Sequence, residues 1–143
     1  MSLIGQFLWG TTVLGICAII HVGMVAGSIP VLIKAANTAD DRFPKLKVAF
    51  LVGLAFAMIV AAHTVQIWVW AFSFVALSAL PDIETAVYFS LVTYTTLGYG
   101  DLVLAENLRI FGAFSAMTGL LTFGVSTAFL VGLVARVLPK SLD

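Results

Sequence analysis

The sequence predicts an all-α membrane protein with three transmembrane helices and one short helix between the second and the third. Of the 143 residues, 62% are hydrophobic and only 10% are charged, whereas soluble domains contain about 25% charged residues. Three apolar stretches each exceed the roughly 20 residues that a spanning helix needs. The net charge is zero, which favours no polyanionic partner such as a nucleic acid.

The first apolar stretch, residues 1–34, is expected to be an extra N-terminal transmembrane helix. Pro30 should bend or end it near the following loop. It has neither a basic n-region nor a cleavage site near a short apolar core, so we expect it to be retained and not cleaved as a signal peptide. Our default expectation is that it braces the second helix at the lipid-facing periphery. Cys17, the single cysteine, is expected to pack without a redox role.

Residues 35–47 read as a hydrated loop that carries much of the positive charge of the sequence. The positive-inside rule places this loop in the cytoplasm. Arg136 and Lys140 then place the short tail, residues 139–143, on the same side, and the N-terminus lies outside.

The second stretch, residues 48–78, is expected to form an outer helix. Trp68 and Trp70 lie roughly 33–36 Å from its cytoplasmic end at about 1.5 Å per residue. That is the height of an outer aromatic belt, which Trp9 of the first helix would share.

Two histidines lie inside apolar stretches, where ionisable groups raise a functional question. Counted from the belt tryptophans, His21 and His63 lie about 18 Å and 8 Å below the outer interface, so direct pairing is not expected. They could be pH sensors, a metal pair or neutral groups hydrogen-bonded between helices. We favour the last interpretation, with Gln66 in the same network.

A short helix is expected over residues 82–94, because Pro81 and the carboxylates of Asp82 and Glu84 suit a helix start. It would be about 20 Å long, too short to cross a hydrocarbon core of about 30 Å. Residues 95–101, if extended, would return a similar distance. The segment should therefore enter the membrane and leave on the same side.

Residues 95–101 read Thr-Thr-Leu-Gly-Tyr-Gly-Asp, with glycines at alternate positions. A row of backbone carbonyls can replace the water around a cation if successive carbonyls point the same way, which requires an alternating backbone hand. Gly98 and Gly100 can take positive φ at little cost. The Thr96 hydroxyl adds an oxygen, and the negative C-terminal end of the short helix favours a cation.

This string resembles the selectivity filter of the potassium channel family. The order of outer helix 48–78, pore helix 82–94, filter 95–101 and inner helix 107–138 resembles the pore domain of that family. The resemblance implies a potassium-selective channel, a homotetramer in the lipid bilayer of a prokaryotic plasma membrane. It implies K⁺ in the filter, no organic cofactor and no enzymatic activity.

The resemblance also assigns roles to single residues. Backbone carbonyls would coordinate K⁺ along Thr96, Leu97, Gly98 and Tyr99, and Gly100 completes the ion-binding segment. Residues that would support the filter or form its outer mouth are Tyr88, Phe89, Thr93, Thr95 and Asp101. Tyr99 would brace the filter against an aromatic cuff of Tyr88 and Phe89, and Gly119 falls near an inner-helix hinge.

Three departures from the family pattern stand out. Leu97 replaces the commoner Val or Ile, and Val92 stands where some members carry a carboxylate, so Asp101 needs another partner, for which Tyr88 is the candidate. The first helix has no arginine ladder, so the resemblance to voltage-gated members stops at the pore.

The alternatives are a weakly selective monovalent cation channel, against which Tyr99 argues, and a non-conducting regulatory membrane subunit.

Four hydroxyl side chains and one aromatic side chain of the last apolar stretch form a further candidate set: Thr118, Thr122, Phe123, Ser126 and Thr127. They could face a water-filled cavity below the filter or pack between helices, and the sequence leaves both interpretations open.

Overall fold

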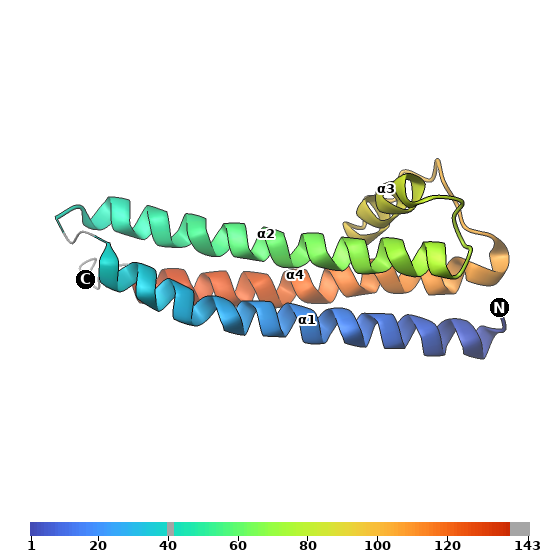
Figure 1. Ribbon diagram of the computed structural model, residues 1–143, viewed down its shortest axis with the longest axis horizontal. Helices are drawn as coiled ribbons and strands as arrows, with labels where there is room; N and C mark the ends of the chain where they lie inside the picture. Colours follow the sequence, from blue (N-terminus) through green and yellow to red (C-terminus); the bar gives the residue numbers. More distant parts are fainter. Residues whose placement is uncertain (40–41, 138–143) are drawn as a thin grey trace.

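The computed structural model describes residues 1–39 and 42–137 (Figure 1). Over these residues it contains long helices, one short helix and one 3-10 turn, and no strand. The elements in order are α1 (Leu3–Thr38), α2 (Pro44–Ala76), α3 (Ile83–Tyr94), η1 (Glu106–Leu108) and α4 (Arg109–Val137). Three helical segments are long and apolar enough to cross a membrane, which confirms the predicted all-α class. Position 138 and the tail 139–143 lie outside the described residues.

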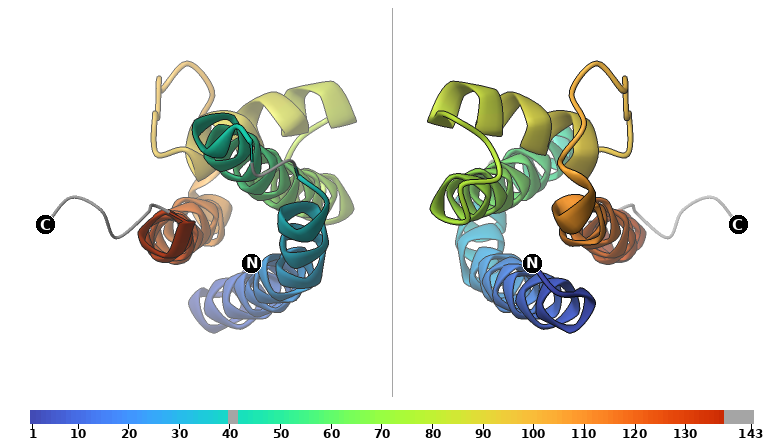
Figure 2. Two further views of the ribbon diagram at one scale, coloured as in Figure 1. Left: turned by 90° about the vertical axis from the view of Figure 1, so that its left-hand side faces the viewer. Right: turned by 90° about the vertical axis from the view of Figure 1, so that its right-hand side faces the viewer.

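The helices α2 and α4 form a central pair, with α1 on one side and α3 on the other (Figure 2). The helix α1 packs against both members of the pair, and among the described residues no Cα atom of α1 lies within 8 Å of a Cα atom of α3. The expectation that the first helix braces only the outer helix was therefore too narrow. It supports the inner helix as well.

The first helix continues past Pro30 to Thr38, so of the two expected outcomes, a bend or an end at Pro30, the end is excluded. Proline is tolerated inside transmembrane helices because neighbouring groups compensate for the lost backbone bond. The second helix begins at Pro44, where a proline suits the first turn. Much of the segment 35–47 is thus helical, and the connection between the two helices is short.

The outer part of the bundle holds an aromatic core. Trp70 is completely buried and packs against Phe74 and Phe111, with ring centroids 5.7 and 5.4 Å away. Trp68 is 41% exposed. Residues two apart on a helix point to opposite sides, so both could not face the lipid, and the placement of Trp70 in the aromatic belt was wrong.

The short helix α3 begins where Asp82 caps it: the carboxylate accepts hydrogen bonds from the Thr85 amide at 2.8 Å and the Thr85 hydroxyl at 2.9 Å. These bonds hold the pKa of Asp82 below its ordinary value. From this cap α3 runs back along α2, and residues 95–105 return to the end of the bundle where α4 begins (Figure 1).

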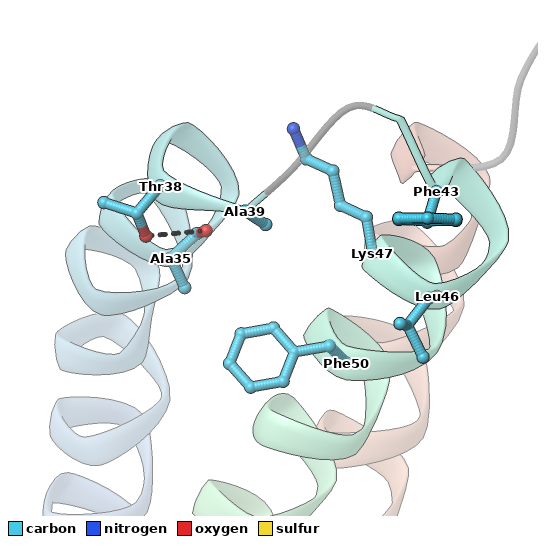
Figure 3. A pocket seen from close by; sticks show the side chains of 7 residues that line it. All are labelled: Ala35, Thr38, Ala39, Phe43, Leu46, Lys47 and Phe50. Atoms are coloured by element: carbon cyan, nitrogen blue, oxygen red, sulfur yellow. Dashed lines mark hydrogen bonds between the residues drawn. The ribbon is translucent and has the colours of Figure 1, made fainter.

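A hollow of about 490 Å³ lies at the opposite end of the bundle, between the end of α1 and the start of α2 (Figure 3). Its lining residues are Ala35, Thr38, Ala39, Phe43, Leu46, Lys47 and Phe50. The Thr38 hydroxyl donates to the Ala35 carbonyl within α1 at 3.1 Å. This mostly apolar hollow is remote from residues 95–101.

Candidate functional site

The backbone of residues 95–101 alternates in hand. Positive φ angles occur at Thr96 (60°), Gly98 (56°) and Gly100 (77°), every second residue. Alternation at the two glycines follows from their conformational freedom. Thr96 was not predicted to share it, because a β-branched residue rarely adopts positive φ. Such strain persists only where the surroundings enforce it.

Hydrogen bonds connect the start of this segment to the last turn of α3. The Val92 carbonyl accepts hydrogen bonds from the amides of Leu97 at 3.0 Å and Gly98 at 3.1 Å, and the Thr96 amide donates to the Thr93 carbonyl at 2.9 Å. These bonds satisfy carbonyl groups that the end of a helix leaves unpaired. The Thr95 hydroxyl adds a bond of 2.6 Å to the same turn, at the Leu91 carbonyl.

Residues 95–101 are exposed along their whole length in the single protomer. The side chains of Leu97 and Tyr99, both large, are 56% and 69% exposed. Residues 95–101 therefore lie on the surface of the chain and are not covered by its other elements.

Tyr88 holds the last residue of this segment, because its hydroxyl donates to the Asp101 carboxylate at 2.5 Å. Asp101 therefore has the partner expected for it in place of a carboxylate at Val92. Phe89 is buried, with its ring centroid 5.1 Å from that of Phe74. Phe89 thus supports α3 from within the protomer core, and its part in an aromatic cuff around Tyr99 stays a prediction.

Carboxylates also lie at the start of α3, at Asp82 and Glu84, and in the turn before α4, at Glu106. Arg109 pairs with Glu106 at 3.9 Å and donates to the Leu104 carbonyl at 3.2 Å. The capping and the pairing are compatible with an acidic outer mouth.

A buried set of polar side chains, which we call the transverse network, crosses the bundle behind residues 95–101. Its members are Gln66, His21, Ser126, His63, Tyr94 and Thr122. His21 contacts Gln66 at 2.8 Å and Ser126 at 3.0 Å. His63 contacts Ser126 at 3.1 Å and Tyr94 at 2.7 Å. The Tyr94 hydroxyl contacts the Thr122 hydroxyl at 2.8 Å.

The two histidine rings lie side by side, with centroids 5.0 Å apart, so the expectation that they would not pair in depth was wrong. Counting from the tryptophans assumed that Trp9 and Trp68 lie at the same level. In the antiparallel pair of α1 and α2, His21 and His63 lie almost equally far from the connection. The predicted participation of Gln66 in a network with a histidine is confirmed.

Thr122 and Ser126 are buried between helices, as is Thr118. In the protomer they pack between helices, the second of the two interpretations left open. Among the described residues, no group of three or more His, Cys, Asp or Glu side chains comes together.

Gly119 lies against the end of α3. A Cβ atom at this position would lie 1.9 Å from the Tyr94 carbonyl oxygen. The hinge expected near Gly119 stays a prediction, but this contact gives the glycine a packing reason: only a hydrogen atom fits there.

The fold and this site define an integral membrane protein with a two-helix pore unit, formed by α2, α3 and α4, and one additional helix. A family model described as an ion channel matches residues 60–136, more than half of the sequence. The protein therefore belongs to the ion channel family of the two-helix pore type. The match leaves α1 outside. Comparisons with curated proteins and with solved structures found no significant match.

Proposed function

We propose that this protein is a potassium-selective channel that conducts K⁺ passively through a homotetrameric pore. The observation that carries the proposal is the alternating backbone hand at Thr96, Gly98 and Gly100. This alternation allows successive carbonyls, from Thr96 to Tyr99, to point toward one axis. Rings of such carbonyls replace the hydration shell of K⁺ in channel filters.

The exposure of residues 95–101 supports assembly. One protomer supplies one wall of an ion path, and four copies related by a closed rotation would enclose it. The large side chains of Leu97 and Tyr99, more than half exposed in the protomer, would be covered by neighbouring copies. A monomer would leave both apolar groups in water or lipid.

The geometry of α3 supports a re-entrant loop. Its 12 residues span about 18 Å at about 1.5 Å per residue, less than the hydrocarbon core of about 30 Å. With the basic connection between α1 and α2 in the cytoplasm, residues 95–101 open to the outside. The carboxylates of Asp82, Glu84 and Glu106 would then raise the local concentration of cations.

Conduction would proceed as entry, dehydration and displacement. A hydrated K⁺ ion reaches the acidic mouth, exchanges water for the carbonyl oxygens between Tyr99 and Thr96, and is displaced by the next ion. Binding at several adjacent sites keeps each site weak enough for exit. The partial negative charge at the C-terminal end of α3 favours the ion at the inner side.

The test is uptake of radioactive Rb⁺ into proteoliposomes of the purified protein, with competing K⁺ or Na⁺. We expect uptake that K⁺ suppresses and Na⁺ does not. Suppression by both ions would indicate the weakly selective cation channel, and absence of uptake would indicate the non-conducting membrane subunit.

A matched pair of glycine variants localises the path. Gly98→Ala places a side chain at a φ of 56°, which costs roughly 1–2 kcal/mol, and should abolish selective uptake. Gly53→Ala makes the same change on α2, where no atom outside the adjacent part of that helix lies within 4 Å of the new Cβ, and should retain it. Selective uptake through Gly98→Ala would contradict the assignment of the filter.

A further inference from the structure

We propose that His63 is a positioning residue for the filter, and that α1 sets its hydrogen-bonding state through His21. The inference rests on the proposed function and concerns the part of the molecule that the family match leaves out. It is carried by the transverse network, which links α1 to the last residue of α3 through the central pair of helices.

The network crosses the molecule from one side to the other. The helices α1 and α3 lie on opposite sides of α2 and α4 (Figure 2), and among the described residues no Cα atom of α1 lies within 8 Å of a Cα atom of α3. His21 comes from α1 and Tyr94 from α3, while Ser126 and His63 join them from α4 and α2. All of these side chains are less than one-tenth exposed.

The Gln66 amide gives the network its direction. Its nitrogen donates to the Ala62 carbonyl at 3.1 Å and lies 2.8 Å from Nδ1 of His21. The reverse amide orientation would put the Gln66 oxygen against the Ala62 carbonyl, acceptor against acceptor. Nδ1 of His21 therefore accepts, and a neutral His21 carries its hydrogen on Nε2.

The remaining donors follow in order. Nε2–H of His21 donates to Ser126, so the Ser126 hydroxyl donates to Nε2 of His63. A neutral His63 then carries its hydrogen on Nδ1 and donates to the Tyr94 hydroxyl. Tyr94 donates to Thr122, whose own hydroxyl donates to a carbonyl of α4. Each link thus has one donor and one acceptor when both histidines are neutral.

Tyr94 transmits this order to the filter. It is completely buried and is the last residue of α3, two positions before the strained Thr96. Its ring packs against Phe123, with centroids 5.7 Å apart. Its backbone carbonyl lies against Gly119. The hydroxyl is the one polar group of the Tyr94 side chain, and it is held between His63 and Thr122.

Loss of the His21 hydrogen bond in α1 would therefore alter the hydrogen bonds next to the filter. Without the N–H of His21, the Ser126 hydroxyl is free to rotate and no longer fixes which nitrogen of His63 carries the hydrogen. If the hydrogen moves to Nε2, Nδ1 of His63 becomes an acceptor. The Tyr94 hydroxyl must then donate to it, and the Thr122 hydroxyl must leave the Thr118 carbonyl in order to donate to Tyr94. Because buried polar groups are costly when unpaired, the end of α3 would lose its single arrangement.

The test measures K⁺ over Na⁺ selectivity of Rb⁺ uptake in proteoliposomes for His21→Leu, Tyr94→Phe and the double variant. We expect each single variant to lower the selectivity by about tenfold, the change that loss of about 1.4 kcal/mol produces. The double variant should be no less selective than the single variants, because both changes interrupt one network. Thr12→Val is the control, since that hydroxyl bonds only within α1 on an exposed face, and it should keep wild-type selectivity.

A second pair of variants separates positioning from packing. An amide can both accept and donate, so His63→Gln should retain selectivity that His63→Leu loses. Ser126→Ala removes only one oxygen atom between the histidines and decides the question if His21→Leu does not assemble.

Three results would overturn the inference. Wild-type selectivity in assembled His21→Leu or Ser126→Ala channels would show that α1 does not act on the filter through this network. Additive losses in the double variant would show that the two residues act separately. A wild-type protein that conducts no Rb⁺ would overturn the proposed function, and this inference with it.

Discussion

Replacing Gly119 by alanine tests the contact between the inner helix and the end of α3. The new Cβ would lie 1.9 Å from the Tyr94 carbonyl oxygen and 2.9 Å from its carbonyl carbon. Carbon–oxygen contacts in proteins lie at about 3.3–3.6 Å, so α4 or the end of α3 must retreat by roughly 1.4 Å. The obstructing atoms belong to the backbone, so no side-chain rotation relieves the clash.

The cost can be isolated with a matched substitution on the same helix. Overpacking of this kind costs about 1–3 kcal/mol, while an alanine in place of a helical glycine gains up to about 1 kcal/mol. Gly124→Ala brings the same gain, but apart from its chain neighbours and the adjacent backbone of α4, no atom lies within 4 Å of its new Cβ. The difference between the two variants should therefore be about 1–3 kcal/mol.

The assay is thermal unfolding of the detergent-solubilised protein. Samples are heated to a series of temperatures, and size-exclusion chromatography then measures how much folded protein remains. Gly119→Ala should unfold at a lower temperature than Gly124→Ala, by about 2–4 °C for each kcal/mol. Equal stability of the two variants would refute the packing role. If Gly119→Ala also changed channel opening, that result would favour the hinge predicted near this position.

Two further predictions concern the ends of helices. The pKa of Asp82 is lowered in the folded state by its bonds to Thr85, so its stabilising effect is present above the unfolded pKa of about 3.9 and lost as the pH falls through the folded value. The thermal stability of the wild type relative to Asp82→Asn should thus decrease between pH 5 and pH 3, and an unchanged difference would contradict the capping role. The Gln6 side chain of α1 accepts hydrogen bonds from two amides at the start of α4, at 3.1 and 3.3 Å. Gln6→Leu should therefore destabilise the protein by about 1–3 kcal/mol in the same assay, whereas Thr12→Val should have little effect, and equal stability of these two variants would exclude this cap.

Local patterns in the sequence predicted much of the pore unit. Residues that are close together in the sequence determine these features. They are the three long apolar stretches, which also indicate the membrane class, the start of the short helix at Asp82, and the alternating glycines at 98 and 100. The partnership of Tyr88 with Asp101 followed from a single departure at Val92. Such features can be read without knowing how distant helices meet.

Contacts between distant helices could not be read in this way. Periodicity does not tell which side of a mostly apolar helix faces which neighbour, so the burial of Trp70 and the support of α4 by Gln6 were missed. Depth counting failed for His21 and His63 because it assumed one level for tryptophans on separate helices. Tyr94 carries no local signal of its role, since its partners His63 and Thr122 lie far away in the sequence.

Anomalous scattering from Rb⁺ in crystals of the assembled protein would test the ion path most directly. We predict four copies around one axis, with a column of Rb⁺ peaks on that axis between the carbonyl oxygens of Thr96 and Tyr99. The peaks should weaken or vanish when Na⁺ replaces Rb⁺. An assembly that does not place four copies of residues 95–101 around one axis, or an axis without Rb⁺, would contradict a potassium-selective filter in this protein.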